Sequence, residues 1–151
     1  MEVSTNSTNW LFRLLIKPQF ILFCFALYNL LDIPVRYGAT CLYNYQPFLW
    51  FAFLLFLAAS ALWLGKWWSL LGAAVFTGYT VYGFVYETLK IFNVLPITPE
   101  EIETLGTPEN WIGFMSNNPD TPLQILLATI IGIFAIVGLA RLAFRKRLVL
   151  S

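Results

Sequence analysis

Three polar side chains at the end of the first long apolar stretch have types and spacing that could form a substrate, proton or ligand site. Asp32 and Arg36 are four residues apart, and Asn29 lies one turn before Asp32, so a helix aligns all three. Ionisable groups within a membrane span are costly and by default mark a substrate, proton or ligand site. We nevertheless favour a structural ion pair, because Pro34 loosens the helix and Arg36 can reach the membrane surface. A binding site is the second interpretation.

A second candidate site is a row of tyrosines, Tyr79, Tyr82 and Tyr86, followed by Glu87. Their spacings of three, four and seven residues place the tyrosines on one helical face. Tyrosine hydroxyls in lipid need hydrogen-bond partners, so we expect this face to point into the bundle. The pattern favours packing and hydrogen bonding between helices. The alternative is a site that binds a quinone-like or amphipathic ligand, or that carries protons between Asp32 and Glu87.

Small and basic residues indicate contacts rather than chemistry. Small residues at about one-turn spacing let helices approach closely, and they are Ala74, Gly78, Ala128, Gly132, Ala135 and Gly138. We expect them to pack within one chain, with a contact to another subunit as the alternative.

Basic residues that can hold anionic lipid headgroups lie near both termini: Arg13, Lys17, Arg141, Arg145, Lys146 and Arg147. Those at the C-terminal end favour a topology anchor over recruitment of a partner.

The composition excludes several classes of protein. Only 11% of the residues are charged, the formal net charge is +1, and there is no histidine. A soluble domain has roughly a quarter charged residues, so a soluble enzyme, a nucleic-acid binder, a zinc finger and a bis-histidine haem protein are excluded. The chain also lacks a nucleophile elbow, a P-loop, Rossmann glycines and cysteines at metal-ligand spacing. We expect no catalytic residue, no metal and no cofactor.

Four long apolar stretches predict the elements that position these residues. A spanning helix needs about 20 mostly apolar residues, and residues 18–35, 47–65, 67–90 and 122–142 meet this requirement. The sequence therefore predicts an all-α membrane protein, a four-transmembrane-helix bundle in a single domain. An amphipathic stretch at 10–17 predicts an interfacial helix, and residues 143–151 form a basic tail.

The long loop at 93–121 is acidic and carries helix-start signals. Its charged residues are five carboxylates: Glu100, Glu101, Glu103, Glu109 and Asp120. Thr98-Pro99 and Thr107-Pro108 each place a capping threonine before a proline at the first helical position. We expect two short helices on the outer surface, at 99–105 and 108–115.

The basic residues predict the orientation in the membrane. With four spans, seven of the nine basic residues lie on the side of the two termini, and the side richer in lysine and arginine is cytoplasmic. We therefore expect both termini in the cytoplasm and the acidic loop on the outer side. A bacterial inner (cell) membrane is the expected location.

The plan of four short spans, with LWLGKWWSLLGAAV around the tight turn between the second and third, resembles the small DoxX-like membrane proteins. This resemblance covers residues 62–75 and transfers no functional residue. We expect a non-catalytic accessory, scaffold or assembly subunit of a larger membrane complex, whose partners are the bilayer and other membrane subunits and not nucleic acid. The alternative is a lipophilic-ligand or quinone-like carrier, or a redox-associated protein, with a polar seam between the first and third spans.

Overall fold

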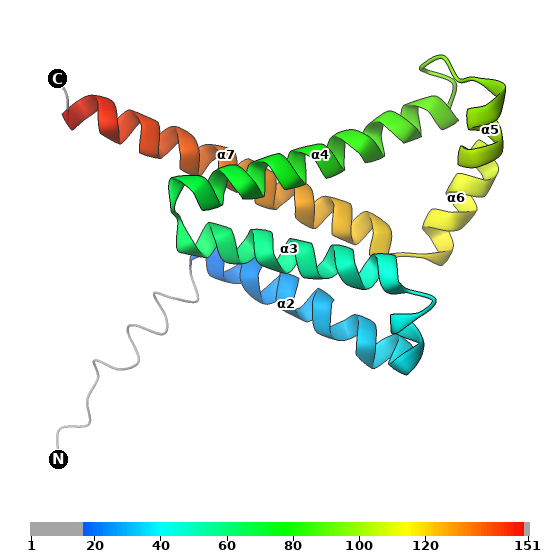
Figure 1. Cartoon of the computed structure of the whole chain (residues 1–151), viewed down its shortest axis with the longest axis horizontal. Helices are drawn as coiled ribbons and strands as arrows, with labels where there is room; N and C mark the ends of the chain where they lie inside the picture. Colours follow the sequence, from blue (N-terminus) through cyan, green and yellow to red (C-terminus); the bar gives the residue numbers. More distant parts are fainter. Residues whose placement is uncertain (1–16, 150–151) are drawn as a thin grey trace.

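The computed structural model describes residues 17–149, which are helical throughout apart from short connections. Four helices are long and apolar enough to cross a membrane (Figure 1): α2 (Pro18–Tyr37), α3 (Gln46–Leu64), α4 (Trp67–Ile91) and α7 (Asp120–Val149). This confirms the all-α fold with four candidate spans. Residues 10–16, where an interfacial helix is expected, lie outside the described part of the chain.

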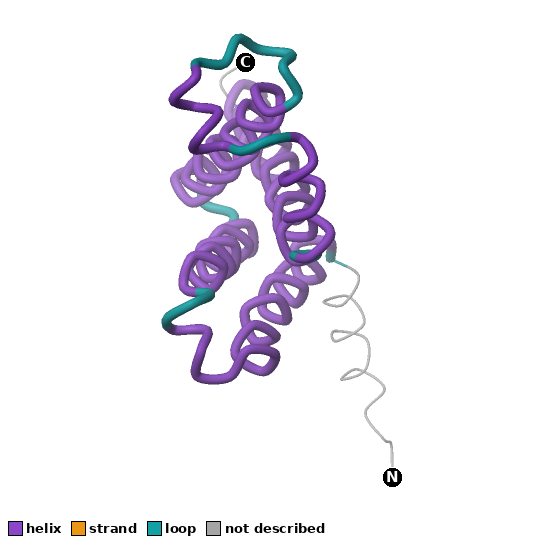
Figure 2. The backbone as a smooth tube through the Cα atoms, turned by 90° about the vertical axis from the view of Figure 1, so that its right-hand side faces the viewer, coloured by secondary structure: helices purple, strands orange, loops and turns teal. Residues whose placement is uncertain are grey.

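The connections divide the bundle into two ends. One end, called the loop end below, carries three short helices: η1 (Gly38–Leu42), α5 (Pro99–Leu105) and α6 (Pro108–Asn117). Figure 2 views the molecule from the loop end, where α5 and α6 pass in front of the long helices and no strand is drawn among the described residues. The opposite end, called the turn end, holds the start of α2, the turn between α3 and α4, and the end of α7 (Figure 1).

The helices pack in two pairs joined by α3. Helix α2 packs mainly on α3, and α4 packs mainly on α7, while α3 also contacts both α4 and α7. Small and branched side chains from all four helices fill the centre: Leu22, Ala26, Leu55, Ala58, Ala59, Leu62, Leu70, Ala73, Leu127, Ala128, Ile131 and Ala135. Helix α3 therefore lies between α2 and α4.

Close contact between α4 and α7 depends on glycines in α7. A Cβ atom built on Gly132 would lie 2.7 Å from the Thr77 hydroxyl, and one built on Gly138 would lie 3.0 Å from a methyl group of Leu70. Thr77 is fully buried and its hydroxyl donates to the Ala73 carbonyl at 2.7 Å. Absence of a side chain on Gly132 thus lets the two backbones approach, as small residues do in membrane helices generally.

A lysine and a glutamate attach the short loop helices to the bundle. Lys90, near the end of α4, is buried, donates to the Glu101 carboxylate, and has its ammonium 4.9 Å from the centre of the Tyr86 ring. Glu101 also accepts from the Thr98 backbone N–H at 3.0 Å, which completes a capping box at the start of α5. The hydrogen bond from Lys90, with that from Thr98, holds the pKa of Glu101 below its ordinary value.

Candidate functional site

An ion cluster joins the end of α2 to the start of α7. The Arg36 guanidinium donates from Nη1 to the two carboxylate oxygens of Asp120, at 3.0 and 3.2 Å, and from Nη2 to Asp32. The Tyr37 hydroxyl donates to the same Asp120 carboxylate at 3.2 Å. One cation therefore lies between two acids: Asp120, 84 residues later in the chain, and Asp32, one turn earlier on α2.

The cluster is placed where helix ends favour its charges. Asp120 lies in the first turn of α7 and Arg36 in the last turn of α2, so each charge is stabilised by its own helix dipole. The Asp120 residue is buried, whereas the Arg36 side chain remains 44% exposed. Because Arg36 reaches the surface, this arrangement fits a structural clamp between α2 and α7 better than an activated acid or base.

Sequence reasoning found half of this cluster. The spacing of Asp32 and Arg36 predicts their pair, but Asp120 is expected in the acidic loop, and no spacing signal points to Tyr37. The helix-start signal Thr121-Pro122 places Asp120 immediately before the last span, where its carboxylate meets the other helix ends. That signal was present, but nothing in the sequence connects this end to Arg36.

Two buried amides lie one turn deeper than the two acids. Asn29 precedes Asp32 on α2, Gln124 follows Asp120 on α7, and both are buried. The Asn29 Nδ2, the Gln124 Nε2 and the Thr121 Oγ1 atoms are buried with no hydrogen-bond partner in the described part of the chain. A buried donor without a partner costs about 1–3 kcal/mol, so these atoms are sites of unmet hydrogen-bonding capacity.

A pocket of about 460 Å³ opens between α3, α4 and α7 at the loop end. We call it the loop-end pocket, and its lining includes Phe48 and Phe51 of α3, Gly83 and Glu87 of α4, and Thr121 and Gln124 of α7. The pocket therefore contains two of the three unpartnered polar groups. Asn29, Asp32 and Arg36 do not line it, so the first candidate constellation and this pocket are separate features.

The tyrosine row points away from the bundle, contrary to the expectation from the sequence. Tyr79 is 78% exposed and Tyr82 is 65% exposed, while Tyr86 is 39% exposed and stacks on Tyr82 at 5.8 Å. The physical reason is the buried position of Thr77, which faces α7. At about 100° per residue, all three tyrosines lie 140–200° around the helix from Thr77.

The predicted polar seam between the first and third spans does not form in the described chain. Helix α3 separates α2 from α4, so Asn29 and Asp32 do not converge with the tyrosines. Tyr79 and Glu87 instead line the loop-end pocket with α7. A proton path from Asp32 to Glu87 along one seam is therefore not supported by this arrangement.

The small residues divide into two groups. In α7, Ala128, Gly132 and Ala135 are buried and Gly138 contacts Leu70. In α4, Ala74 packs against the core, but Gly78 is exposed, and a Cβ atom built on it would meet no atom within 4 Å. The small residues of α7 are therefore used within the chain, whereas Gly78 is not.

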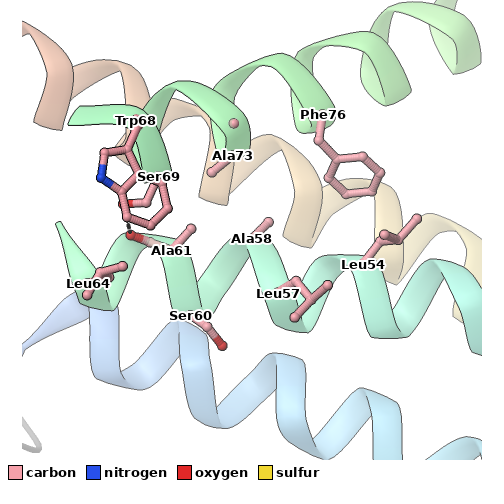
Figure 3. A pocket seen from close by; sticks show the side chains of 11 residues that line it. Leu54, Leu57, Ala58, Ser60, Ala61, Leu64, Trp68, Ser69, Ala73 and Phe76 are labelled. Carbon is pink, nitrogen blue, oxygen red and sulfur yellow. Dashed lines mark hydrogen bonds between the residues drawn. The ribbon is translucent and has the colours of Figure 1, made fainter. Parts of the chain in front are cut away.

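A second large cavity lies at the turn end, between α3 and α4 (Figure 3). It has a volume of about 490 Å³, and apolar side chains such as Leu54, Leu57 and Phe76 form its walls. Its two serine hydroxyls are satisfied, because Ser60 donates to the Phe56 carbonyl at 2.7 Å and Ser69 donates to the Ala61 carbonyl at 3.0 Å. The mostly apolar walls suit this cavity to hydrocarbon.

The predicted headgroup-binding residues lie at the turn end as far as they are described. Lys17, Arg141 and Arg145 are exposed there, and the two arginines line a pocket of about 280 Å³. Arg13 and the side chains of Lys146 and Arg147 fall outside the described residues.

Within residues 17–149, no group of three or more acidic or cysteine side chains is arranged to hold a metal ion.

Comparisons of the chain with protein-family models, with curated protein sequences and with solved structures gave no match.

Proposed function

We propose that this protein is a non-catalytic accessory, scaffold or assembly subunit of a larger membrane complex. In this proposal, the outward side of α4 packs against a transmembrane helix of another subunit. That side, called the tyrosine face, consists of Leu71, Val75, Gly78, Tyr79, Tyr82 and Tyr86. The observation that carries the proposal is the exposure of Tyr79 and Tyr82 in the middle of a membrane-spanning helix.

The depth of Tyr79 makes its exposure costly. Tyr79 is the central residue of α4, about 18 Å from either end of the helix. The hydrocarbon core is about 30 Å thick, so the hydroxyl lies well inside it. A hydroxyl without a hydrogen bond in an apolar medium costs roughly 2–7 kcal/mol. A polar side chain or a free carbonyl on a partner helix would remove this cost.

Gly78 supplies the close approach that such a contact needs. It lies beside Tyr82 on the tyrosine face, and the space in front of it is open. A glycine next to hydrogen-bonding side chains is typical of interfaces between membrane helices. Tyr28 on α2 is also exposed, but its face carries no further tyrosine and no glycine. The tyrosine face is therefore better suited to a partner than the outer side of α2.

We also infer that both termini are cytoplasmic. The two basic residues at the loop end, Arg36 and Lys90, are each paired with carboxylates. Lys17, Lys66 and Arg141 at the turn end are exposed. Since the positive-inside rule counts basic residues near span ends, the turn end belongs on the cytoplasmic side.

Cysteine labelling in intact cells tests this orientation. With Cys24 and Cys41 replaced by alanine, we expect Ser116→Cys in α6 to react with a membrane-impermeant maleimide, and Lys66→Cys in the α3–α4 turn to react only after the membrane is opened. The reverse pattern would contradict the inferred orientation.

Site-specific photo-crosslinking in native membranes tests the contact itself. A benzophenone amino acid at Tyr82 is compared with the same group at Phe25, which is 59% exposed on α2. We expect Tyr82 to give a discrete adduct with a different membrane protein, and Gly78→Leu to abolish it. Adducts with lipid alone, or with a second copy of this chain alone, would contradict an accessory role.

A further inference from the structure

Two of the three buried donors without a partner in the described residues belong to the loop-end pocket, and the third, on Asn29, lies outside it. Gln124 is 2% exposed and its Nε2 has no partner in the described chain, and neither has the Thr121 Oγ1. The other threonine hydroxyls of the four long helices donate to carbonyls of their own helix, as Thr80 does to Phe76 and Thr129 does to Ile125. Thr121 is the second residue of α7, so no preceding helical turn is present to accept from it. Both donors therefore require an acceptor from outside the helix.

The pocket has room for such an acceptor and an apolar wall beside it. Gly83 lines the pocket, and a Cβ atom built on it would meet no atom within 4 Å. Phe48 and Phe51 supply aromatic surface from α3. Tyr79, which is largely exposed, lies two turns deeper than Glu87 on the same helix. A molecule held here can therefore have its head near Gln124 and its tail in the bilayer.

The charges around the pocket indicate an uncharged head. Its lining includes the Glu87 carboxylate and no basic residue. The two basic residues at the loop end, Arg36 and Lys90, are already paired with Asp120 and Glu101. An anionic head would thus meet a like charge without a balancing cation. Amide and hydroxyl donors next to aromatic walls match a neutral carbonyl oxygen on a hydrocarbon body.

We propose that the loop-end pocket binds a membrane-soluble molecule through an uncharged carbonyl oxygen, which accepts hydrogen bonds from the Gln124 amide and the Thr121 hydroxyl. The hydrocarbon part lies against Phe48 and Phe51 and extends past Tyr79 into the bilayer. The ester group of a glycerolipid and the ring carbonyl of a quinone share this chemistry. The site shares Tyr79 with the tyrosine face, but its two hydrogen-bond donors, Gln124 and Thr121, lie on α7 and outside that face.

Binding measurements on the full-length chain, delipidated in mild detergent, test the proposal. The two probes are dioleoylglycerol and a decyl-substituted benzoquinone, and each is paired with an analogue that lacks carbonyls, a dialkylglycerol ether and decylbenzene. We expect saturable binding of one carbonyl probe in native mass spectrometry and equilibrium titration, and which probe binds identifies the source. Failure of both probes to bind, or equal binding of a probe and its analogue, would overturn the proposal.

Two variants and a matched control locate the binding. Gln124→Leu keeps the size of the side chain but removes the amide, so we expect affinity for the carbonyl probe to fall about tenfold. Gly83→Leu places a side chain in open space within the pocket, so binding should be lost. Gly78→Leu makes the same change on the opposite side of α4, and binding should persist. Unchanged binding in both pocket variants would refute the site.

Stability of the unliganded chain provides a second readout. Since Gln124 is buried without a partner, Gln124→Leu should raise the melting temperature in the absence of probe while weakening the binding. A lower melting temperature would show that the amide is satisfied within the fold, and would contradict the proposal. The crosslink from the tyrosine face should be unaffected by Gln124→Leu, which separates failure of this site from failure of the accessory role.

Discussion

Replacing Gly132 by alanine tests the contact between α4 and α7 most sharply. The new Cβ would lie 2.7 Å from the Thr77 hydroxyl and 3.4 Å from the Thr77 Cβ. Thr77 cannot rotate freely, because it is fully buried and its hydroxyl donates to the Ala73 carbonyl. Relief of this steric overlap therefore requires either loss of the Thr77–Ala73 hydrogen bond or separation of α4 from α7.

The expected magnitude follows from overpacking in a filled core. Adding a methyl group without space costs about 1–3 kcal/mol, which for a chain of this size lowers the melting temperature by roughly 2–12 °C. Gly78→Ala is the matched control, since it makes the same change on α4 in open space. There alanine should stabilise the helix by about 0.5–1 kcal/mol. The two substitutions should therefore have opposite signs.

Thermal unfolding in mild detergent, followed by tryptophan fluorescence, measures both effects. A Thr77→Ala background should remove most of the cost of Gly132→Ala, because it deletes the oxygen at 2.7 Å and leaves only the 3.4 Å contact. If Gly132→Ala were tolerated as well as Gly78→Ala, the close packing of α4 on α7 would be refuted.

Two further predictions concern the charges at the loop end. Asp120→Asn should lower the free energy of unfolding by about 1–2 kcal/mol, because Arg36 loses one of its two carboxylates while its side chain stays partly in water. Thermal unfolding measures this effect, with Glu103→Gln, at an exposed acid, as the control. An equal effect of the two substitutions would argue against the clamp between α2 and α7. The pKa of Glu101 is lowered by Lys90, so its contribution to stability is present above its ordinary pKa of 4.5 and is lost as the pH falls through the lower, folded-state value. Wild type and Glu101→Gln should therefore differ in melting temperature at neutral pH and converge in acid, and a difference that persists in strong acid would contradict this contact.

Long apolar stretches made the four spans predictable, since span length and hydropathy are dictated by the bilayer. The starts of α5 and α6 coincide with Pro99 and Pro108 because each follows a threonine that caps the helix. These signals are local, and each can be found in a few consecutive residues.

The orientation of helix faces was not predictable from the same sequence. Lipid is as apolar as a leucine side chain, so a membrane helix has no polar outer face to mark its inside. The tyrosines of α4 predict an inward face only if their hydroxyls find partners within this chain, and Tyr79 and Tyr82 are exposed instead. The buried face is set by Thr77 and Gly132, which contact each other across 55 residues of sequence.

The roles of Asp120 in the ion cluster and of Gln124 in the loop-end pocket were not predictable for a related reason. Asp120 and Gln124 gain their roles only when the start of α7 lies beside α2, α3 and α4. In the linear sequence Asp120 is one of several acids in a loop, and Gln124 is a single polar residue in an apolar run. Their roles depend on contacts with residues of other helices, and spacing along the chain does not predict those contacts.

The size of the complex isolated from native membranes tests the central claim, that the tyrosine face contacts another subunit, most directly. We expect the wild-type chain in mild detergent to have a mass well above that of one chain and to contain a different membrane protein. Tyr79→Phe combined with Tyr82→Phe should reduce it to the free chain, whereas Tyr28→Phe, at a similarly exposed tyrosine on α2, should leave it intact. A wild-type chain that is monomeric, or a complex that survives loss of both hydroxyls, would contradict the account.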